Sequence, residues 1–358
     1  MPKISEFQGI LRKKKIDAFL SINLGYGNLI SDMLYFAGYS GTGAIIIPQN
    51  KKPFLVVPEG ELNSAKKCSL KVYTSNKTRR LFETIKDIAK KNKIKLTRIG
   101  INKSEFTLSL KDILRKKMPK SRLTDLQKGL YRLREQKTAE EIKVIRKGCG
   151  ISDEILNKCF SQFKEFKTES AVLAFLEYEA KKRGCELAFP TIVASGIHSS
   201  EVHHTTQNSQ LKKGFCLIDF GIRYKNYCTD TSRTIYMGNP SKIEVELYDK
   251  LLSVQKKAIS MLRPNMKCSK VFKNVKDNLG NHAKFFTHGL GHGVGIMIHE
   301  LPSFFDDSKD KVKEGSVFTI EPGIYLNKFG IRIEDTILLN HGKIEILTKV
   351  GKELKIIK

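Results

Sequence analysis

The chain has 358 residues, of which 40% are hydrophobic, and it holds 26 glycines and 10 prolines. This composition is typical of globular domains and excludes a disordered or collagen-like chain, and the length suits two domains of ordinary size. The apolar runs are only a few residues long, whereas a membrane-spanning helix needs about 20 residues, and the first residues lack the apolar core of a signal peptide. We therefore expect no membrane partner and no secretion.

The net charge of +27 is concentrated near the start of the chain, where residues 1–130 carry +17 with 27 basic and 10 acidic residues. Such an excess attracts polyanions in a salt-dependent way. The basic residues nevertheless stand between apolar positions, as at Lys13–Lys15, without the interleaved aromatic residues of a nucleic-acid surface. We expect solvated helix faces and no specific binding of nucleic acid.

Seven cysteines are scattered along the chain, and none belongs to a CxxC pair. A disulfide framework or a thiolate zinc site has closer and more regular spacing. The pattern therefore predicts reduced, mostly buried cysteines and a cytoplasmic protein.

The first part of the chain alternates helix and strand patterns, which predicts a small α/β domain over residues 1–125. In chain order, the expected segments are a helix over 5–14, a strand over 18–22, a hairpin of 43–48 and 53–57, a helix over 81–92, a strand over 98–101 and a helix over 108–117.

A polar connector over 123–137 leads into a second domain, expected over residues 130–358. Thr138 is positioned to cap a long amphipathic helix, with Glu141 as the reciprocal partner of a capping box. Further helix patterns cover 169–183 and 243–262, and glycine-punctuated strand patterns dominate from residue 186 onward. The second domain is therefore expected to be α+β.

Two segments of the second domain resemble each other, Gly214–Ile222 and Gly315–Ile324. Each carries an acid after an apolar strand pattern, and each is followed by a turn and a second strand that bears another acid. The repetition predicts two related hairpins, each donating two carboxylates, within a pseudo-symmetric antiparallel sheet.

Four acids stand within these apolar strand patterns, Asp219, Asp230, Glu321 and Glu334. Burying an unpaired carboxylate costs several kcal/mol. Any one of them could lie on the solvated face of its strand, but four such acids favour a shared cationic partner. A divalent metal supplies that charge, and oxygen ligands suit Mn, Co, Fe or Zn.

Five of the eight histidines fall in two clusters, one at His203 and His204 and the other at His288, His292 and His299. A lone histidine is more often a core residue than a ligand, but the second cluster is spaced by glycines, which let the backbone approach a site closely. The HExxH pattern of helical zinc sites is absent from the sequence, so that kind of site is not predicted.

Taken in chain order, these residues resemble the dinuclear site of the pita-bread (M24-type) metallopeptidases, the family of methionine aminopeptidase, aminopeptidase P and prolidase. The blocks that carry the resemblance are His288–Gly293, Glu321–Tyr325 and Gly330–Thr336. The likeness spans residues 130–358, and the preceding α/β segment is similar to the creatinase-type domain of the proline-specific branch. The five metal ligands that it implies are Asp219, Asp230, His292, Glu321 and Glu334.

The resemblance also implies a mechanism. Two divalent ions, with Mn or Co favoured, would share a water and present a bridging hydroxide to the peptide carbonyl. Glu321 would accept the water proton and pass it to the leaving nitrogen. His203 and His299 would contact the substrate and donate to the developing oxyanion.

Other residues near the site are assigned by the same resemblance. His288 is similar to a third histidine of the substrate pocket, whereas His204 is expected to be a neighbour without a role. Arg332 and Tyr325 resemble a pair beside the ligands, in which Arg332 keeps the metal-binding acids deprotonated and Tyr325 adjoins the substrate. Val202 departs from the family pattern, which usually has a small residue or proline there.

The activity that the resemblance implies is hydrolysis of Xaa-Pro bonds, by a dipeptidase or an aminopeptidase that takes small peptides with proline second, and it favours a homodimer. Methionine aminopeptidase is an alternative that the extra N-terminal domain disfavours. An inactive pita-bread binding protein that uses its basic N-terminal domain is another alternative, and a metal-free creatinase-like hydrolase is a third. Both are disfavoured because all five ligand types are present.

Overall fold

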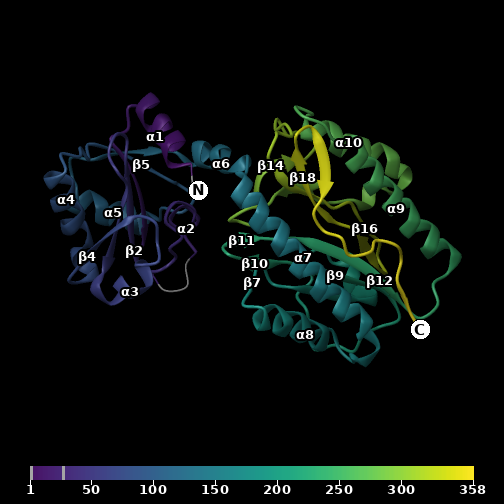
Figure 1. Cartoon of the computed structure of the whole chain (residues 1–358). Coiled ribbons are helices and arrows are strands. Elements are labelled where there is room, and N and C mark those ends of the chain that lie inside the picture. The colour runs from purple at the N-terminus through teal and green to yellow at the C-terminus, as the bar shows by residue number, and fades with distance from the viewer. Residues whose placement is uncertain (1–2, 26–28) are drawn as a thin grey trace. The chain divides into compact units, whose positions relative to one another are not determined.

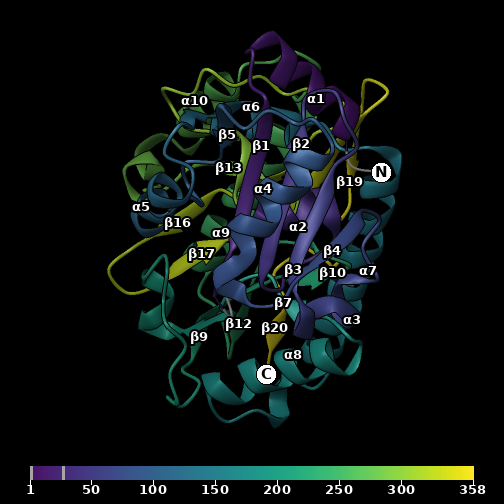
Figure 2. The same ribbon diagram turned by 90° about the vertical axis from the view of Figure 1, so that its left-hand side faces the viewer.

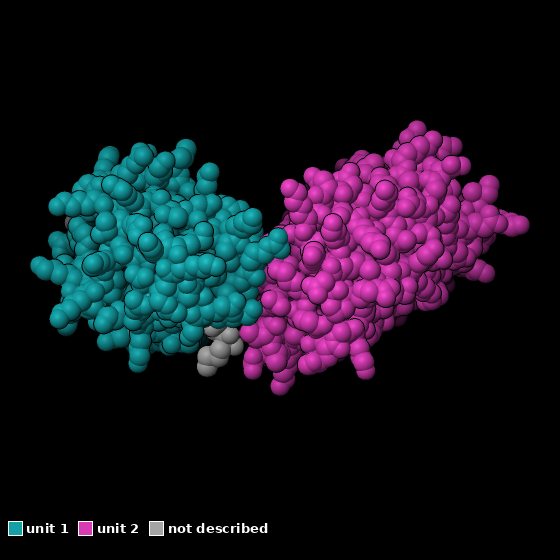
Figure 3. Space-filling model, turned by 90° about the horizontal axis from the view of Figure 1, so that it is seen from above, with its two compact units in different colours: residues 1–133 teal, residues 134–358 magenta. Residues whose placement is uncertain are grey.

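The computed structural model describes residues 3–25 and 29–358 and divides the chain into two compact units, Met1–Leu133 and Arg134–Lys358. Figure 1 labels their elements, and Figure 3 colours the two units separately. The expected ranges 1–125 and 130–358 set the division slightly earlier in the chain and stay a prediction. No helix within the described residues has the length and apolar character to cross a membrane.

The first unit is built on a six-stranded sheet in the order β4-β3-β2-β1-β5-β6. Its strands are β1 (Ala18–Asn23), β2 (Gly43–Pro48), β3 (Phe54–Pro58), β4 (Lys71–Ser75), β5 (Arg98–Ile101) and β6 (Arg122–Asp125). Its helices are α1 (Ile4–Lys13), α2 (Ser31–Ala37), α3 (Leu62–Ala65), α4 (Leu81–Lys91), α5 (Leu108–Lys117) and α6 (Gln127–Glu135), which runs across the unit boundary, with 3₁₀ turns η1 (Glu59–Glu61) and η2 (Thr78–Arg80).

Strand β1 shows why both faces of this sheet carry helices. Successive side chains of a strand point to opposite faces. Phe19 packs against Phe7 of α1 and Phe36 of α2, at ring-centroid distances of 5.1 and 6.2 Å. Leu20 belongs instead to the core shared with Ile85 of α4, the helix that Figure 2 shows in front of the strands. The expected α/β pattern is thus confirmed for this unit.

The prediction of a polar connector over 123–137 is wrong, because β6 and α6 occupy most of this range. Strand β6 pairs in parallel with β5 at the edge of the sheet, and its residues are exposed or half-buried. An edge strand of this kind needs no apolar run. Helix α6 buries Leu130 and Leu133 among charged neighbours, so its apolar stripe is too narrow to stand out in the sequence.

The second unit contains four longer helices and two main sheets. The helices are α7 (Ala139–Ser161), α8 (Glu169–Lys182), α9 (Lys242–Ser260) and α10 (Cys268–Leu279), with 3₁₀ turns η3 (Phe163–Glu165), η4 (Gly196–Ser200) and η5 (Gly280–Phe285). One sheet has the order β20-β12-β9-β8 and the other β14-β13-β15-β18-β19. Their strands are β8 (Ile192–Ser195), β9 (Gly214–Phe220), β12 (Thr231–Met237), β13 (Gly291–Gly293), β14 (Glu300–Phe304), β15 (Val317–Ile320), β18 (Asp335–Asn340), β19 (Lys343–Ile346) and β20 (Ile356–Ile357).

Two smaller sheets complete the unit, in the orders β11-β10-β7 and β16-β17. Their strands are β7 (Glu186–Leu187), β10 (Ile222–Tyr224), β11 (Tyr227–Cys228), β16 (Gly323–Tyr325) and β17 (Gly330–Arg332).

The predicted start of α7 is confirmed by a complete capping box. The Thr138 hydroxyl accepts from the Glu141 amide at 3.3 Å, and the Thr138 amide donates to the Glu141 carboxylate at 2.7 Å. Such caps satisfy amide groups that the first helical turn leaves unpaired.

The expected hairpin repeat is present, since β9 pairs antiparallel with β12 and β15 pairs antiparallel with β18. The first sheet is mixed, because β12 pairs in parallel with β20. Side chains of α7 and α8 share a core with one sheet, and those of α9 and α10 share a core with the other. Each half of the unit is therefore a helix pair on a sheet.

Strand alternation carries the acids away from both helix pairs. Cys216 and Ile218 of β9 face the core of α7 and α8, so Asp219 between Ile218 and Phe220 points to the other face. Ile320 of β15 faces the core of α9 and α10, and Glu321 follows with the opposite orientation. Each acid therefore leaves its sheet on the face opposite the one that packs on that sheet's own helix pair.

Candidate active site

Acids from both hairpins surround His292 of β13. The His292 Nε2 atom lies 3.5 Å from Asp230 Oδ2 and 3.3 Å from Glu321 Oε1. Ligand atoms of Asp230, His292 and Glu334 all lie within 4.8 Å of one another. Residues far apart in the chain thus present oxygen and nitrogen atoms to one small volume.

Arg332 of β17 connects this cluster to its surroundings. Its Nη2 atom donates to Asp219 Oδ2 at 2.6 Å, and its Nε donates to the Ser232 hydroxyl at 2.8 Å. Ser232 in turn donates to Glu334 Oε2 at 2.7 Å. Arg332 Nη1 also donates to the Tyr325 hydroxyl at 2.9 Å. One guanidinium, 3% exposed, therefore contacts Asp219 directly and Glu334 through the Ser232 hydroxyl.

The acids oppose one another's ionisation. Burial, followed by repulsion from Glu334, raises the pKa of Asp230 well above its usual range. Burial, followed by repulsion from Glu321, raises the pKa of Glu334 in the same way. Burial also raises the pKa of Glu321 to about 7, against the lowering effect of Arg332. One arginine does not supply enough positive charge for this many buried carboxylates.

The donor set fits divalent metal ions. The buried Asp219 Oδ1 has no hydrogen-bond partner within the described part of the chain, although buried oxygens normally have one. Burial and the neighbouring His299 lower the pKa of His292 to about 3, so its imidazole is neutral and can offer a lone pair. Carboxylate oxygens with one neutral imidazole form a site that suits divalent metals.

Glycines allow His292 to reach this position, as its glycine-spaced run predicts. A Cβ on Gly291 would lie 2.0 Å from the Thr319 carbonyl oxygen, and one on Gly293 would lie 2.1 Å from that of Leu301. Both flanking positions therefore require glycine, because any side chain there would prevent β13 from fitting between β15 and β14.

The other candidate histidines adjoin the cluster. His288 Nε2 lies 3.0 Å from the Tyr325 hydroxyl, and burial followed by repulsion from Arg332 lowers the pKa of His288 to about 3. The ring of His299 meets that of His292 edge-on at 4.3 Å. His203 is exposed in the turn after η4. The pKa of His299 is lowered, first by burial and then by repulsion from His203.

A family model described as metallopeptidase family M24 matches residues 143–341, and one described as the creatinase/prolidase N-terminal domain matches residues 3–136. The chain belongs to metallopeptidase family M24. Both parts of the expected fold, a creatinase-type α/β part and an α+β pita-bread part, are thereby confirmed.

Relatives of the chain cover almost all of its length. The Xaa-Pro dipeptidase of Pyrococcus furiosus is 34% identical over 330 residues, which cover 90% of this chain and 92% of that protein. The solved X-Pro aminopeptidase of Thermotoga maritima MSB8 has a TM-score of 0.88 at 29% identity, covering 97% of this chain and 100% of that one. The prolidase structure from Pyrococcus horikoshii OT3 has a TM-score of 0.88 at 31% identity, covering 98% and 99%.

Two hydroxyl residues of this M24 site are absent from the sequence prediction. Ser232 bonds Glu334, and the Thr319 hydroxyl donates to Glu321 Oε1 at 3.1 Å. Ser232 lies opposite Asp219 in the pairing of β12 with β9. The pairing of Ser232 with Asp219 would have indicated that Ser232 lies at the site, but this pairing is known only once the two strands are aligned.

The expectation that His204 has no role is not supported by its surroundings in the M24 fold. Its side chain is fully buried, with Glu201 Oε2 at 2.8 Å from Nδ1 and Glu169 Oε2 at 3.3 Å from Nε2. His204 therefore has an acid as partner at each ring nitrogen, and one of these acids, Glu169, is fully buried.

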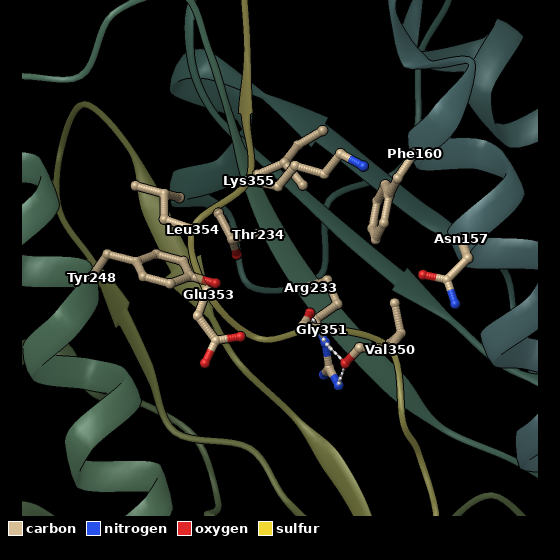
Figure 4. Close-up of a pocket in the computed structure, with 11 residues that line it drawn as sticks. Asn157, Phe160, Arg233, Thr234, Tyr248, Val350, Gly351, Glu353, Leu354 and Lys355 are labelled. Carbon is tan, nitrogen blue, oxygen red and sulfur yellow. Dashed lines mark hydrogen bonds between the residues drawn. The ribbon is translucent and has the colours of Figure 1, made fainter.

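A separate pocket of the second unit, drawn in Figure 4, includes no candidate site residue among its lining. Its buried Arg233 donates to the Val350 carbonyl at 2.8 Å and to Asp335 at 2.8 Å. These bonds hold the segment after β19 against β12, so we regard the arginine as structural. The pocket is lined by Asn157, Phe160, Arg233, Thr234, Ile235, Tyr248, Val350, Gly351, Glu353, Leu354 and Lys355.

Proposed function

We propose that this chain hydrolyses the bond before proline in small peptides that carry proline second, using two divalent metal ions. The supporting observation is the convergence of mutually repelling buried carboxylates on a neutral His292. The proposed ligands are Asp219, Asp230, His292, Glu321 and Glu334, and Mn(II) or Co(II) is the favoured metal. The similarity to a protein named Xaa-Pro dipeptidase supports the substrate class.

When bound, the metals supply Lewis acidity toward the substrate carbonyl and lower the pKa of a water toward neutrality. Glu321 then has the proton-transfer role. Its carboxylate would accept the proton of the water and pass it to the leaving nitrogen, as an acid–base group does. The Thr319 hydroxyl fixes one of its oxygens at 3.1 Å, so the carboxylate is oriented before substrate arrives.

The proposed substrate contacts are made by His203, His288, His299 and Tyr325. His203 and His299 are exposed, so their ring N–H groups can reach a bound peptide and donate to the oxyanion. His288 and Tyr325 hydrogen-bond to each other, which orients both side chains. Arg332 offsets the repulsion among the acids and keeps Asp219 oriented.

The choice between a dipeptidase and an aminopeptidase remains part of this proposal, since the similar solved structures carry both kinds of name. We also propose a cytoplasmic homodimer that binds neither membranes nor nucleic acid specifically. The methionine aminopeptidase and non-enzymatic alternatives are not favoured, because the donor set is complete and the creatinase-type part is present.

The test is hydrolysis of Ala-Pro, Ala-Pro-Ala and Ala-Ala by the full chain with added Mn(II), with Met-Ala-Ser as the probe for methionine aminopeptidase. We expect cleavage before proline and at most weak cleavage of the other two peptides. His292→Ala under the same conditions controls for contaminating peptidases. Cleavage of Met-Ala-Ser alone, or equal activity of the His292 variant, would contradict the proposal.

A further inference from the structure

A second group of metal-ligand side chains lies outside the candidate catalytic cluster. Glu169, the first residue of α8, has a fully buried carboxylate between two histidines. Its Oε1 atom lies 2.9 Å from His198 Nδ1, and its Oε2 atom lies 3.3 Å from His204 Nε2. The ligand atoms of the three residues all lie within 4.8 Å of one another.

His204 faces more negative charge than a neutral imidazole can satisfy. Its Nδ1 lies 2.8 Å from Glu201 Oε2, and its Nε2 faces Glu169. A neutral ring carries only one N–H. If that hydrogen is donated to Glu201, the lone pair on Nε2 points at a carboxylate oxygen. A second ring proton, or a metal ion held between Nε2 and Glu169, removes this repulsion.

The groups around the Glu169 carboxylate already orient it for such an ion. The Ser195 amide and hydroxyl donate to Glu169 Oε1 at 2.7 and 2.9 Å. Burial acts to raise the pKa of Glu169, but these bonds and that of His198 outweigh it and lower the pKa, so the carboxylate is ionised. Oε1 is thus held by its donors, and Oε2 is directed toward His204.

The two imidazoles are arranged side by side over this carboxylate. The rings of His198 and His204 stack with centroids 4.5 Å apart and an interplanar angle of 20°. Both therefore direct one nitrogen toward the same acid. The His198 side chain is 22% exposed, which leaves a path for an ion to enter from solvent.

We propose that Glu169, His198 and His204 bind a divalent transition-metal ion of the zinc class at a site separate from the catalytic cluster. Two imidazole nitrogens and one carboxylate oxygen form a familiar zinc donor set with one position left for water. Glu201 orients His204 through its other nitrogen, and Ser195 orients Glu169, as supporting residues commonly do around metal ligands. A dication also balances the charges of the two acids.

The ion would join α8 to the segment from η4 to His204, which contains the candidate substrate contact His203. Its function would be to fix this segment, and peptide hydrolysis does not require it. The inference therefore goes beyond the proposed function and is independent of it.

The first test is the zinc content of the full chain after loading with zinc and removal of loosely bound ion. The double variant His198→Gln/His204→Gln should retain about one zinc equivalent less per chain than wild type. His341→Gln, which removes a histidine from an exposed turn, should match wild type. Equal zinc content in the double variant and wild type would overturn the proposal and leave a proton-linked network without metal.

A second test covers the case in which the double variant does not fold. Glu201→Gln changes an acid whose side chain is 61% exposed and should weaken zinc binding at this site about 10-fold. Crystals soaked in zinc should also show an anomalous-scattering peak about 2.0–2.2 Å from His198 Nδ1 and His204 Nε2. Absence of this peak, with zinc present at the catalytic cluster, would overturn the proposal without bearing on the peptidase activity.

Discussion

Arg332 Nη2 lies 2.6 Å from Asp219 Oδ2 and joins β17 to β9, strands of two different sheets. The same guanidinium holds the Tyr325 hydroxyl and the Ser232 hydroxyl. Three separate parts of the site thus depend on one planar, fork-shaped cation. Lysine carries the same charge but lacks this set of directed donors.

Arg332→Lys should therefore reduce both metal retention and turnover. We expect metal affinity to fall about 10- to 100-fold, the usual effect of losing a residue that orients metal ligands. The measurement is metal content after dialysis, together with kcat on Ala-Pro. Arg263→Lys, at an exposed arginine, is the matched control. Unchanged metal retention in Arg332→Lys would show that the guanidinium does not hold the acids in place.

Glu321→Gln and His292→Ala should each lower kcat by at least about 10²-fold, the scale of lost acid–base or ligand function. Gln keeps the size of Glu321 and its contact with Thr319, but it neither accepts the proton nor supplies a charged ligand. Steady-state kinetics on Ala-Pro gives the comparison, and Glu314→Gln, at an exposed position, controls for the substitution itself. Wild-type turnover in either variant would remove that residue from the proposed mechanism.

Dialysis against a chelator should abolish cleavage of Ala-Pro, and Mn(II) or Co(II) should restore it. The physical reason is that the buried acids repel one another and need added positive charge to ionise together. Thermal unfolding provides a second readout, since an ion bound only by the folded state raises the Tm. Activity that survives complete metal removal would refute the metal-dependent mechanism.

Local patterns were sufficient to predict several elements of the fold. Helix α5 and strand β5 have the predicted bounds, Leu108–Lys117 and Arg98–Ile101. For α5, the Thr107 side chain accepts from the Leu110 amide and marks the helix start. Helix α6 was missed because it has few apolar residues, and which of its residues are buried depends on the tertiary packing around it.

The same distinction applies to the site. The acids inside or next to apolar strands are visible in the sequence because burial of charge is unusual there, and the glycines beside His292 are equally local. The contact between Glu169 and His204 joins residues 35 positions apart, with no repeating pattern to connect them. The bridge between Thr168 and Gln210 and the bond from the Ser195 amide to Glu169 bring these residues together, and both are tertiary contacts.

Gly291→Ala should displace β13 and its histidine. The added Cβ would lie 2.0 Å from the Thr319 carbonyl oxygen, and backbone atoms cannot yield as the end of a side chain can. We expect a loss of stability of about 1–3 kcal/mol, the usual cost of overpacking, with reduced metal retention. Gly150→Ala in α7 is the matched control, since nothing lies within 4 Å of the added atom. Denaturant unfolding and metal content measure the two effects, and equal behaviour of the two variants would contradict the packing argument.

Glu179 of α8 should make the stability of the protein depend on pH in acid. Its buried carboxylate accepts from Lys158 at 2.7 Å and also bonds Arg183. The bonds to Lys158 and then Arg183 lower its pKa from 4.5 to about 2. Because the folded state binds the proton less tightly than the unfolded state, the stabilisation is complete above pH 4.5, declines as the pH falls, and is gone below about pH 2.

Glu179→Gln should accordingly destabilise the protein at pH 7 by about 1–2 kcal/mol, a modest value because Lys158 is 40% exposed and water screens the pair. The difference in unfolding free energy between wild type and variant should shrink as the pH falls below 4.5, the ordinary pKa of the group. Glu177→Gln on the same helix controls for loss of a carboxylate. Urea unfolding at a series of pH values measures the difference, and a difference that stays constant between neutral pH and pH 3 would show that the ion pair does not lower the pKa of Glu179.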